Sequence, residues 1–328
     1  DIERVLKSAG RREPVPEEIE RSVREHLRRE WGEMIAERRS ARRRWSGYAV
    51  AASILVATVG FWLVASSSGT PAGPVATMAV SLDDVRVKTG WLRGWHTAAN
   101  GQKLAAGESL ETGPNGRAAI SLPGIASVRL DQGTRVRIAS AELLVIERGA
   151  LYVDAGVELP GDSQLAIETP SGVVRHVGTQ YEVRLDGAGV RLRVREGRVE
   201  WRSNSGAVER GRAGEQLIIA ADGAVQHEQA SRYGGSWDWI ASTTPAIDIE
   251  GRPLTEFLSW AGRELGREVV FATPEVAEEA DAIVVHGSIE GLTPALALEA
   301  VLATTSVRGS LDAGRIVIAN GRVNDGPD

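Results

Sequence analysis

The sequence contains no cysteine among its 328 residues. This absence excludes disulfide bonds, thiolate nucleophiles and cysteine metal ligands. Histidine is scarce as well, and its five copies stand far apart, at positions 26, 96, 176, 227 and 286. No His-Glu-x-x-His, Gly-x-Ser-x-Gly or glycine-rich phosphate loop occurs, so the sequence motifs of common metalloproteases, serine hydrolases and nucleotide-binding enzymes are missing. We therefore expect no catalytic activity, no metal and no cofactor.

Charged residues are absent from residues 46–66, which read SGYAVAASILVATVGFWLVAS. About 20 consecutive apolar residues in a helix match the hydrocarbon thickness of a bilayer. A cleaved signal peptide is the alternative, but it needs a short basic leader, and here residues 1–45 come first. Five arginines lie immediately before the stretch, at positions 38, 39, 42, 43 and 44, and no Lys or Arg follows it until Arg86. By the positive-inside rule, the sequence predicts one membrane span with a cytoplasmic N-terminus and an exported C-terminal part.

A narrow apolar stripe marks the cytoplasmic piece. From Pro16 onward apolar residues recur at steps of four, which is a helical spacing; they are Ile19, Val23, Leu27, Trp31 and Ile35. One such stripe cannot build a core from 45 residues alone. The stripe therefore binds a partner, with Val23, Leu27, Trp31 and Ile35 as candidate contacts, or it packs against a first short helix or belongs to a solvated stalk. A DNA-reading helix is disfavoured because acidic residues are interleaved with the basic ones.

The exported part begins with short strands separated by glycine turns. Alternating apolar and polar residues, as in RAAISL (117–122) and TQYEVRL (179–185), predict strands. Thr169-Pro170-Ser171-Gly172 predicts a turn, and Gly178-Thr179 predicts a second break. Hairpin turns are expected at four further dipeptides, which are Asn115-Gly116, Asp186-Gly187, Glu196-Gly197 and Asp222-Gly223. This pattern predicts an all-β domain, built as a sandwich or as a solenoid-like sheet.

The sequence period changes after residue 245. PLTEFLSWAGRELG (253–266) and TPALALEAVLATT (293–305) place apolar residues on one helical face. Strands are expected at 246–251, 267–272 and 282–291, and a hairpin at 307–320. The order βαβ-βαββ in a short segment predicts a small α/β module.

The exported part resembles a known family. TPSGVVRHVGTQYEV, followed by LRVREGRVEW and GEQLIIAADG, is similar to the FecR domain of bacterial inner-membrane signalling proteins. The motif positions that carry this resemblance are turn formers, so we expect structural roles for them; they are Thr169, Pro170, Gly172, Gly178, Thr179, Glu196 and Gly197. The final module resembles the short N-terminal domain of secretins and TonB-dependent receptors, and the C-terminal module of FecR proteins.

The resemblance implies a function and two partners. In such proteins a cytoplasmic helical region holds an extracytoplasmic-function sigma factor, and a single span connects it to the periplasmic FecR domain. The last module contacts the signalling domain of an outer-membrane TonB-dependent transducer. The alternative is a membrane-anchored periplasmic scaffold or ligand-binding module with no sigma-factor partner.

The predicted organisation follows from these patterns. Its parts are cytoplasmic helices (1–45), a transmembrane helix (46–66), a flexible spacer (67–79), an all-β domain (80–226), a linker (227–244), an α/β module (245–320) and a tail (321–328).

Overall fold

The computed structural model describes residues 73–321, apart from residues 91–93, 157–163 and 188. All of these belong to one compact unit, Ala72–Asp328. Within the described residues no helix has both the length and the apolar character needed to cross a membrane. The expected cytoplasmic helices and the expected span at 46–66 lie outside the described residues.

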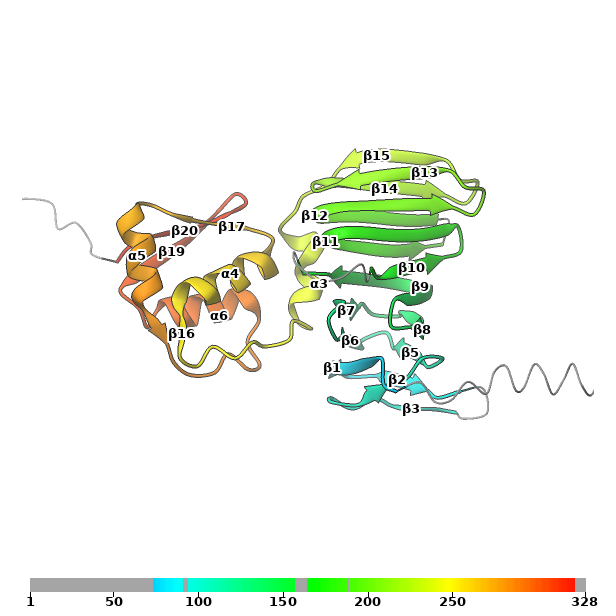
Figure 1. Ribbon diagram of the computed structural model, residues 1–328, viewed down its shortest axis with the longest axis horizontal. Coiled ribbons are helices and arrows are strands. Elements are labelled where there is room, and N and C mark those ends of the chain that lie inside the picture. Colours follow the sequence, from blue (N-terminus) through cyan, green and yellow to red (C-terminus); the bar gives the residue numbers. More distant parts are fainter. Residues whose placement is uncertain (1–72, 91–93, 157–163, 188, 322–328) are drawn as a thin grey trace, which may run out of the picture. The chain divides into compact units, whose positions relative to one another are not determined.

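The first part of the unit, which we call the β domain, consists of strands (Figure 1). They are β1 (Ala76–Leu82), β2 (Val85–Lys88), β3 (Trp95–Thr97), β4 (Lys103–Leu104), β5 (Ser109–Thr112), β6 (Arg117–Leu122), β7 (Ala126–Leu130), β8 (Arg135–Ser140), β9 (Leu143–Asp154), β10 (Ala166–Thr169), β11 (Gly172–Asp186), β12 (Gly189–Ser203), β13 (Val208–Arg212), β14 (Glu215–Ala220) and β15 (Val225–Gln229). The predicted all-β domain is confirmed. Its first strand begins at Ala76, inside the stretch expected to be a spacer.

Ten of these strands hydrogen-bond in the order β15-β14-β12-β11-β10-β9-β7-β6-β1-β4 (Figure 1), and the other five pair beside this path. Neighbouring strands run antiparallel except β9 and β10, which are parallel. Alternate residues point inward, as in β8, where Val136 and Ile138 are buried. The inward side chains form one continuous apolar core from β1 to β15. Burial of this core is the main source of stability of the domain.

Three long strands change partners in the middle, and each does so close to a glycine. Before Gly178, β11 pairs with β10, and after it with β9. Before Gly197, β12 pairs with β14, and after it with β13. In β9 the change from β8 to β7 and β11 occurs near Gly149. Each long strand therefore contributes to two differently oriented parts of the sheet.

The β11–β12 hairpin consequently folds over itself. Val194 precedes the bend in β12 and Val199 follows it, yet both belong to one core cluster. A Cβ added to Gly211 of β13 would lie 2.4 Å from Leu217 of β14, so side chains of the two halves meet. The hairpin thus supplies both layers of a small sandwich, with the apolar core between them.

The C-terminal module (residues 245–321) combines helices with two small sheets. Its elements are β16 (Arg252–Pro253), α4 (Leu254–Leu265), β17 (Glu268–Phe271), α5 (Pro274–Ala282), β18 (Val284–Val285), α6 (Pro294–Leu302), β19 (Val307–Asp312) and β20 (Arg315–Asn320). The strands β17, β20 and β19 form one sheet and β16 and β18 the other. Leu254, Phe257 and Leu258 of α4 are buried in a core separate from that of the β domain.

Three features of this module differ from the sequence prediction, and one of them is that the strand expected at 282–291 is only Val284–Val285. Residues 246–249 are not a strand, and the first strand is only Arg252–Pro253. Helix α5 is not expected from the sequence analysis. It forms because the Thr273 side chain accepts a hydrogen bond from the Val276 backbone N–H, with Pro274 at the first helical position.

Candidate functional site: an arginine-rich junction

Residues 231–244, which we call the docking segment, pack on the β domain. The segment contains η1 (Gly235–Trp237) and α3 (Asp238–Ala241). Trp237 and Ile240 form a buried cluster with Tyr152 of β9. The Trp237 and Tyr152 rings meet edge to face, with centroids 6.1 Å apart. The Trp237 indole N–H donates to the Ser231 carbonyl over 2.7 Å. The stretch expected as a linker is thus anchored by its own apolar residues.

Arg129 of β7 is a buried cation at the junction, the region where the docking segment and the end of α4 meet the β domain. Only 1% of Arg129 is exposed. Its Nη2 donates to Glu264 of α4 over 2.8 Å, and its Nη1 donates to Thr244 over 3.0 Å. Burial alone lowers the pKa of Arg129, but the Glu264 carboxylate more than offsets this, so the pKa is raised. One β-domain side chain therefore contacts both the docking segment and the C-terminal module.

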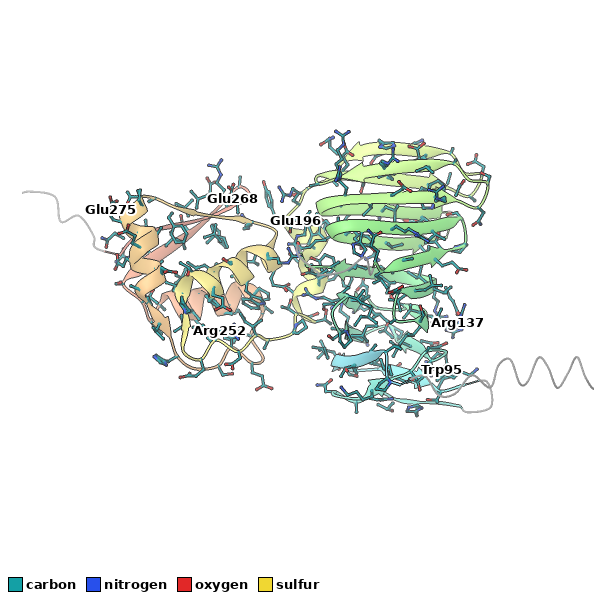
Figure 2. All side chains as sticks on the ribbon, viewed as in Figure 1. Trp95, Arg137, Glu196, Arg252, Glu268 and Glu275 are labelled. Carbon is teal, nitrogen blue, oxygen red and sulfur yellow. The ribbon has the colours of Figure 1, made fainter. Side chains whose placement is uncertain are left out.

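In a second set of ion pairs the cation comes from the C-terminal module, namely Arg263 of α4, and the carboxylates come from the β domain. The Arg263 guanidinium pairs with Asp154 of β9 and, over 3.1 Å, with Glu196 of β12, which Figure 2 labels. Gln180 of β11 donates to the second oxygen of Asp154 over 3.0 Å. Burial lowers the pKa of Arg263, and the two carboxylates reverse the effect and raise it. Two ion pairs thus join the β domain to neighbouring residues of α4. In Arg129–Glu264 the β domain supplies the cation, and in Asp154–Arg263 it supplies the anion.

Gly266 ends α4 and lies directly against the β domain. Its φ of +65° is a left-handed conformation, as is usual for the residue after a helix. A Cβ at this position would lie 2.2 Å from Arg195 Nε and 2.3 Å from the Arg232 carbonyl. Only glycine fits both the backbone conformation and the space.

Arg195 of β12 and Arg232 of the docking segment form a reciprocal contact. The Nε of Arg195 donates to the Arg232 carbonyl over 2.8 Å, and the Nε of Arg232 donates to the Arg195 carbonyl over 2.7 Å. Arg195 and Arg193 also lie over the Trp237 ring, 5.2 and 5.5 Å from its centroid. These contacts fix the docking segment along β12.

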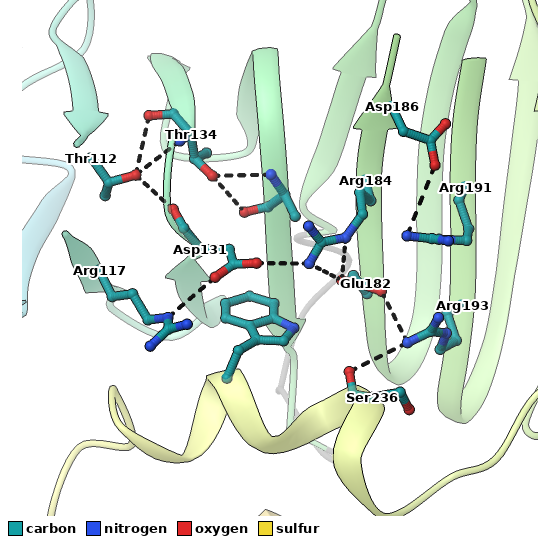
Figure 3. A network of polar contacts seen from close by, with 12 residues as sticks. Thr112, Arg117, Asp131, Thr134, Glu182, Arg184, Asp186, Arg191, Arg193 and Ser236 are labelled. Atoms are coloured by element: carbon teal, nitrogen blue, oxygen red, sulfur yellow. Dashed lines mark hydrogen bonds and ion pairs between the residues drawn. The ribbon is translucent and has the colours of Figure 1, made fainter. Parts of the chain in front are cut away.

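A chain of ion pairs continues from the junction across the sheet (Figure 3). Glu182 of β11 is 1% exposed and pairs with Arg184 over 2.7 Å and with Arg193 over 3.5 Å. Arg184 also reaches Asp131, which pairs with Arg117 of β6. Arg193 donates to the Ser236 carbonyl over 3.3 Å. Buried charges that are paired in this way fix side-chain positions, so the network connects the docking segment to strands β6 and β11.

The family-motif residues lie at three places in the structure, which are the turn from β10 to β11, the middle of β11 and the middle of β12. Thr169, Pro170 and Gly172 form the tight turn from β10 to β11, in which the Thr169 hydroxyl donates to the Gly172 carbonyl over 2.7 Å. Gly178 and Thr179 lie within β11, at the bend described above. The structure thus places a strand bend where the sequence suggests a break.

Glu196 and Gly197 require a correction. The Glu-Gly pair predicts a hairpin turn, whereas the structure places both residues inside β12. Gly197 has φ +74°, and a Cβ on it would lie 2.2 Å from the Gly178 carbonyl. The left-handed glycine therefore bends the strand instead of ending it, because the two glycines pack backbone to backbone. Glu196, next to the bend, reaches Arg263 of the C-terminal module.

The remaining candidates from the sequence are the cytoplasmic stripe and the histidines. Val23, Leu27, Trp31 and Ile35 are outside the described residues. Among the residues that the structure describes, no group of three or more His, Asp or Glu side chains could hold a metal ion. His176 is 4% exposed, and burial lowers its pKa. Its ring lies 5.7 Å from that of Tyr181 inside the β domain.

Comparison with known proteins gives a family match for part of the β domain. The FecR protein family matches residues 108–200, from the start of β5 to the second half of β12. No curated protein matches the sequence at a significant level. Two crystal structures of a "putative anti-sigma factor" from Parabacteroides distasonis are similar, at 18% sequence identity and TM-score 0.35. They cover 65% and 64% of this chain, and 98% and 97% of their own. Residues 108–200, which include the bend at Gly178 and Gly197, are thus the part of the chain that matches the FecR protein family.

Proposed function

We propose that the chain is a single-pass inner-membrane regulator of an extracytoplasmic-function sigma factor. The observation that carries the proposal is the FecR domain at residues 108–200, because FecR-type proteins are regulatory and not catalytic. In this proposal residues 1–45 bind the sigma factor in the cytoplasm and residues 46–66 cross the membrane. The C-terminal module receives the signalling domain of an outer-membrane TonB-dependent transducer in the periplasm.

The junction gives this relay a physical route. A partner that binds the C-terminal module acts on α4, and α4 is joined to the FecR domain through Arg263, Glu264 and Gly266. Binding that favours one position of α4 must shift the equilibrium of these contacts by its differential affinity for the two positions. The proposal therefore assigns the junction the role of transmitting the periplasmic event toward the membrane side of the chain.

The orientation of the chain is tested with reporter fusions. Five arginines at positions 38–44 and no further arginine until Arg86 predict a cytoplasmic N-terminus. A reporter that is active only in the cytoplasm should work when fused near Arg12 and be silent when fused after Gly73. An active fusion at Gly73 would reverse the orientation and remove the basis of the relay.

The sigma-factor contact is tested on the apolar stripe. Trp31→Ala combined with Leu27→Ala should weaken binding of the sigma factor encoded beside this gene by roughly 2–4 kcal/mol, because large apolar anchors dominate interfaces. Co-purification of the full chain from detergent-solubilised membranes measures this, and transcription of the controlled genes should change with it. Transcription rises if the chain inhibits the sigma factor and falls if the chain assists it.

The matched control changes two residues on the opposite face of the same predicted helix. Glu25→Ala with Arg29→Ala has the same spacing and should leave binding unaltered. If the wild-type chain captures no sigma factor, the periplasmic scaffold or ligand-binding module without a sigma partner becomes the better reading. If both double variants bind like the wild type, the stripe is a seam between the two cytoplasmic helices.

A further inference from the structure

A cavity of about 740 Å³ opens at the junction. Its walls come from β11 and β12 of the β domain, from the docking segment and from the region between α4 and β17 in the C-terminal module. This volume lies within the range of pockets that hold small molecules, which is about 300–1,000 Å³. Because both domains line the cavity, its shape depends on the docked arrangement.

Positive charge exceeds negative charge in this cavity. Four arginines line it, namely Arg195, Arg232, Arg263 and Arg267, against the two carboxylates Glu196 and Glu268 (Figure 2). Glu196 is already paired with Arg263, which also pairs with Asp154. Among the residues that line the cavity, the exposed Glu268 is then the one carboxylate left to balance the charges of Arg195, Arg232 and Arg267.

Arg195 has an unused donor in this wall. Arg195 is 2% exposed, and its Nε donates to the Arg232 carbonyl. Its Nη1 is buried and has no hydrogen-bond partner among the described residues. A guanidinium has only donors, so the missing partner must be an acceptor. A buried donor without an acceptor costs free energy, and an anion in the cavity would remove that cost.

Arg267 is held in a fixed position on the other side. Its guanidinium lies 4.7 Å from the centroid of the Tyr233 ring, and its Nη1 donates to the Asp312 carbonyl. The Tyr233 ring in turn packs against Gly314, where a Cβ would lie 3.1 Å from the ring. Arg267 is thus oriented before any ligand binds, which lowers the entropy lost on binding.

We propose that this cavity is a binding site for a small anion bearing phosphate or carboxylate groups. Arg195 and Arg232 hold the anion from the β domain and the docking segment, and Arg267 holds it from the C-terminal module. Guanidinium forks match the geometry of both groups. The bound anion connects the two domains, so it favours the docked state by mass action. This inference goes beyond the proposed sigma-factor regulation and does not depend on it.

The test uses the full chain in detergent micelles and three probes, which are sodium phosphate, sodium pyrophosphate and sodium malonate. Titration calorimetry measures affinity and stoichiometry, and thermal unfolding is compared with sodium chloride at the same ionic strength. We expect one bound anion per chain and an unfolding temperature raised above that in sodium chloride. Stronger binding of the phosphates or of malonate identifies the class of the natural ligand.

Variants locate the site. Arg267→Gln and Arg195→Gln should each lower the affinity for the tightest-binding probe by about tenfold or more, since each removes a charge-assisted contact. Arg210→Gln is the control, because Arg210 is 75% exposed and does not line the cavity. Arg195 is buried against Trp237, so Arg267→Gln keeps the test valid if Arg195→Gln fails to fold.

Three results would overturn the proposal. The first is no binding beyond the sodium chloride control. The second is equal binding by Arg267→Gln and Arg210→Gln, which would mean diffuse attraction to the surface. The third is binding of a glutamate-rich peptide with none of the three small anions, which would make the cavity a protein-docking site.

Discussion

Replacing Glu264 with glutamine is expected to release the C-terminal module from the β domain. The Arg129 guanidinium is 1% exposed and depends on Glu264 for its charge partner. Removing one member of a buried ion pair costs about 3–5 kcal/mol, because the remaining charge is left buried without compensation. We therefore expect the docked state to be destabilised by about 3–5 kcal/mol relative to the undocked state. Protease cleavage within residues 231–244 and a separate unfolding transition for each domain in urea are the measurements.

Two further variants decide whether the effect comes from the buried charge. Glu256 is on the same helix as Glu264 and pairs with Arg252 of β16, and both of these side chains are about half exposed. Glu256→Gln removes this exposed ion pair. That change should cost less than about 1 kcal/mol. Arg129→Met combined with Glu264→Leu removes both charges and should restore docking, since apolar replacement of a buried pair is often neutral. Equal behaviour of Glu264→Gln and Glu256→Gln would contradict the assignment of Arg129–Glu264 as a buried contact.

Gly197→Ala is expected to destabilise the β domain severely. Gly197 has φ +74°, which costs an alanine about 1–2 kcal/mol. The added methyl group would also lie 2.2 Å from the Gly178 carbonyl and 2.7 Å from the Thr179 Cγ2. Overpacking of this kind typically adds about 1–3 kcal/mol. The sum is about 2–5 kcal/mol, measured as the free energy of unfolding in urea.

Gly206→Ala separates the two contributions. Gly206 also has a positive φ, of +94°, but no atom lies within 4 Å of its added Cβ. It should therefore show the conformational cost alone, about 1–2 kcal/mol. The difference between the two variants measures the close approach at the bend. A difference near zero would mean that the two glycines do not pack backbone to backbone.

The sequence predicts the local elements of this fold well where local signals exist. Alternation in RVRIAS and the Asp-Gly pairs at 186–187 and 222–223 correspond to β8 and to the turns after β11 and β14. Helix α5 was missed although Thr273-Pro274 is the same start signal as Thr293-Pro294 of α6. Its apolar stripe is reduced to Val276 and Ala280, so periodicity gives little indication of it.

The bend and the junction could not be predicted in the same way. A left-handed glycine is compatible with a turn and with a strand bend, and only the neighbouring backbone at Gly178 decides between them. Arg129 alternates with apolar neighbours along β7 exactly as an exposed residue would, yet it is buried by residues far along the chain. A local signal did exist in the docking segment, because Trp237, Trp239 and Ile240 are too apolar for a solvated linker.

The Arg129–Glu264 pair also sets an order of events during synthesis. The two residues are 135 positions apart, and chains elongate at about 5–20 residues per second. Arg129 therefore exists for on the order of ten seconds before its partner has been made. Throughout that interval Arg129 lacks its hydrogen-bonded partner Glu264, so we expect the face of β7 that carries Arg129 to remain hydrated. The β domain can build its core first, but this face is completed only when α4 arrives, so the junction assembles after that core.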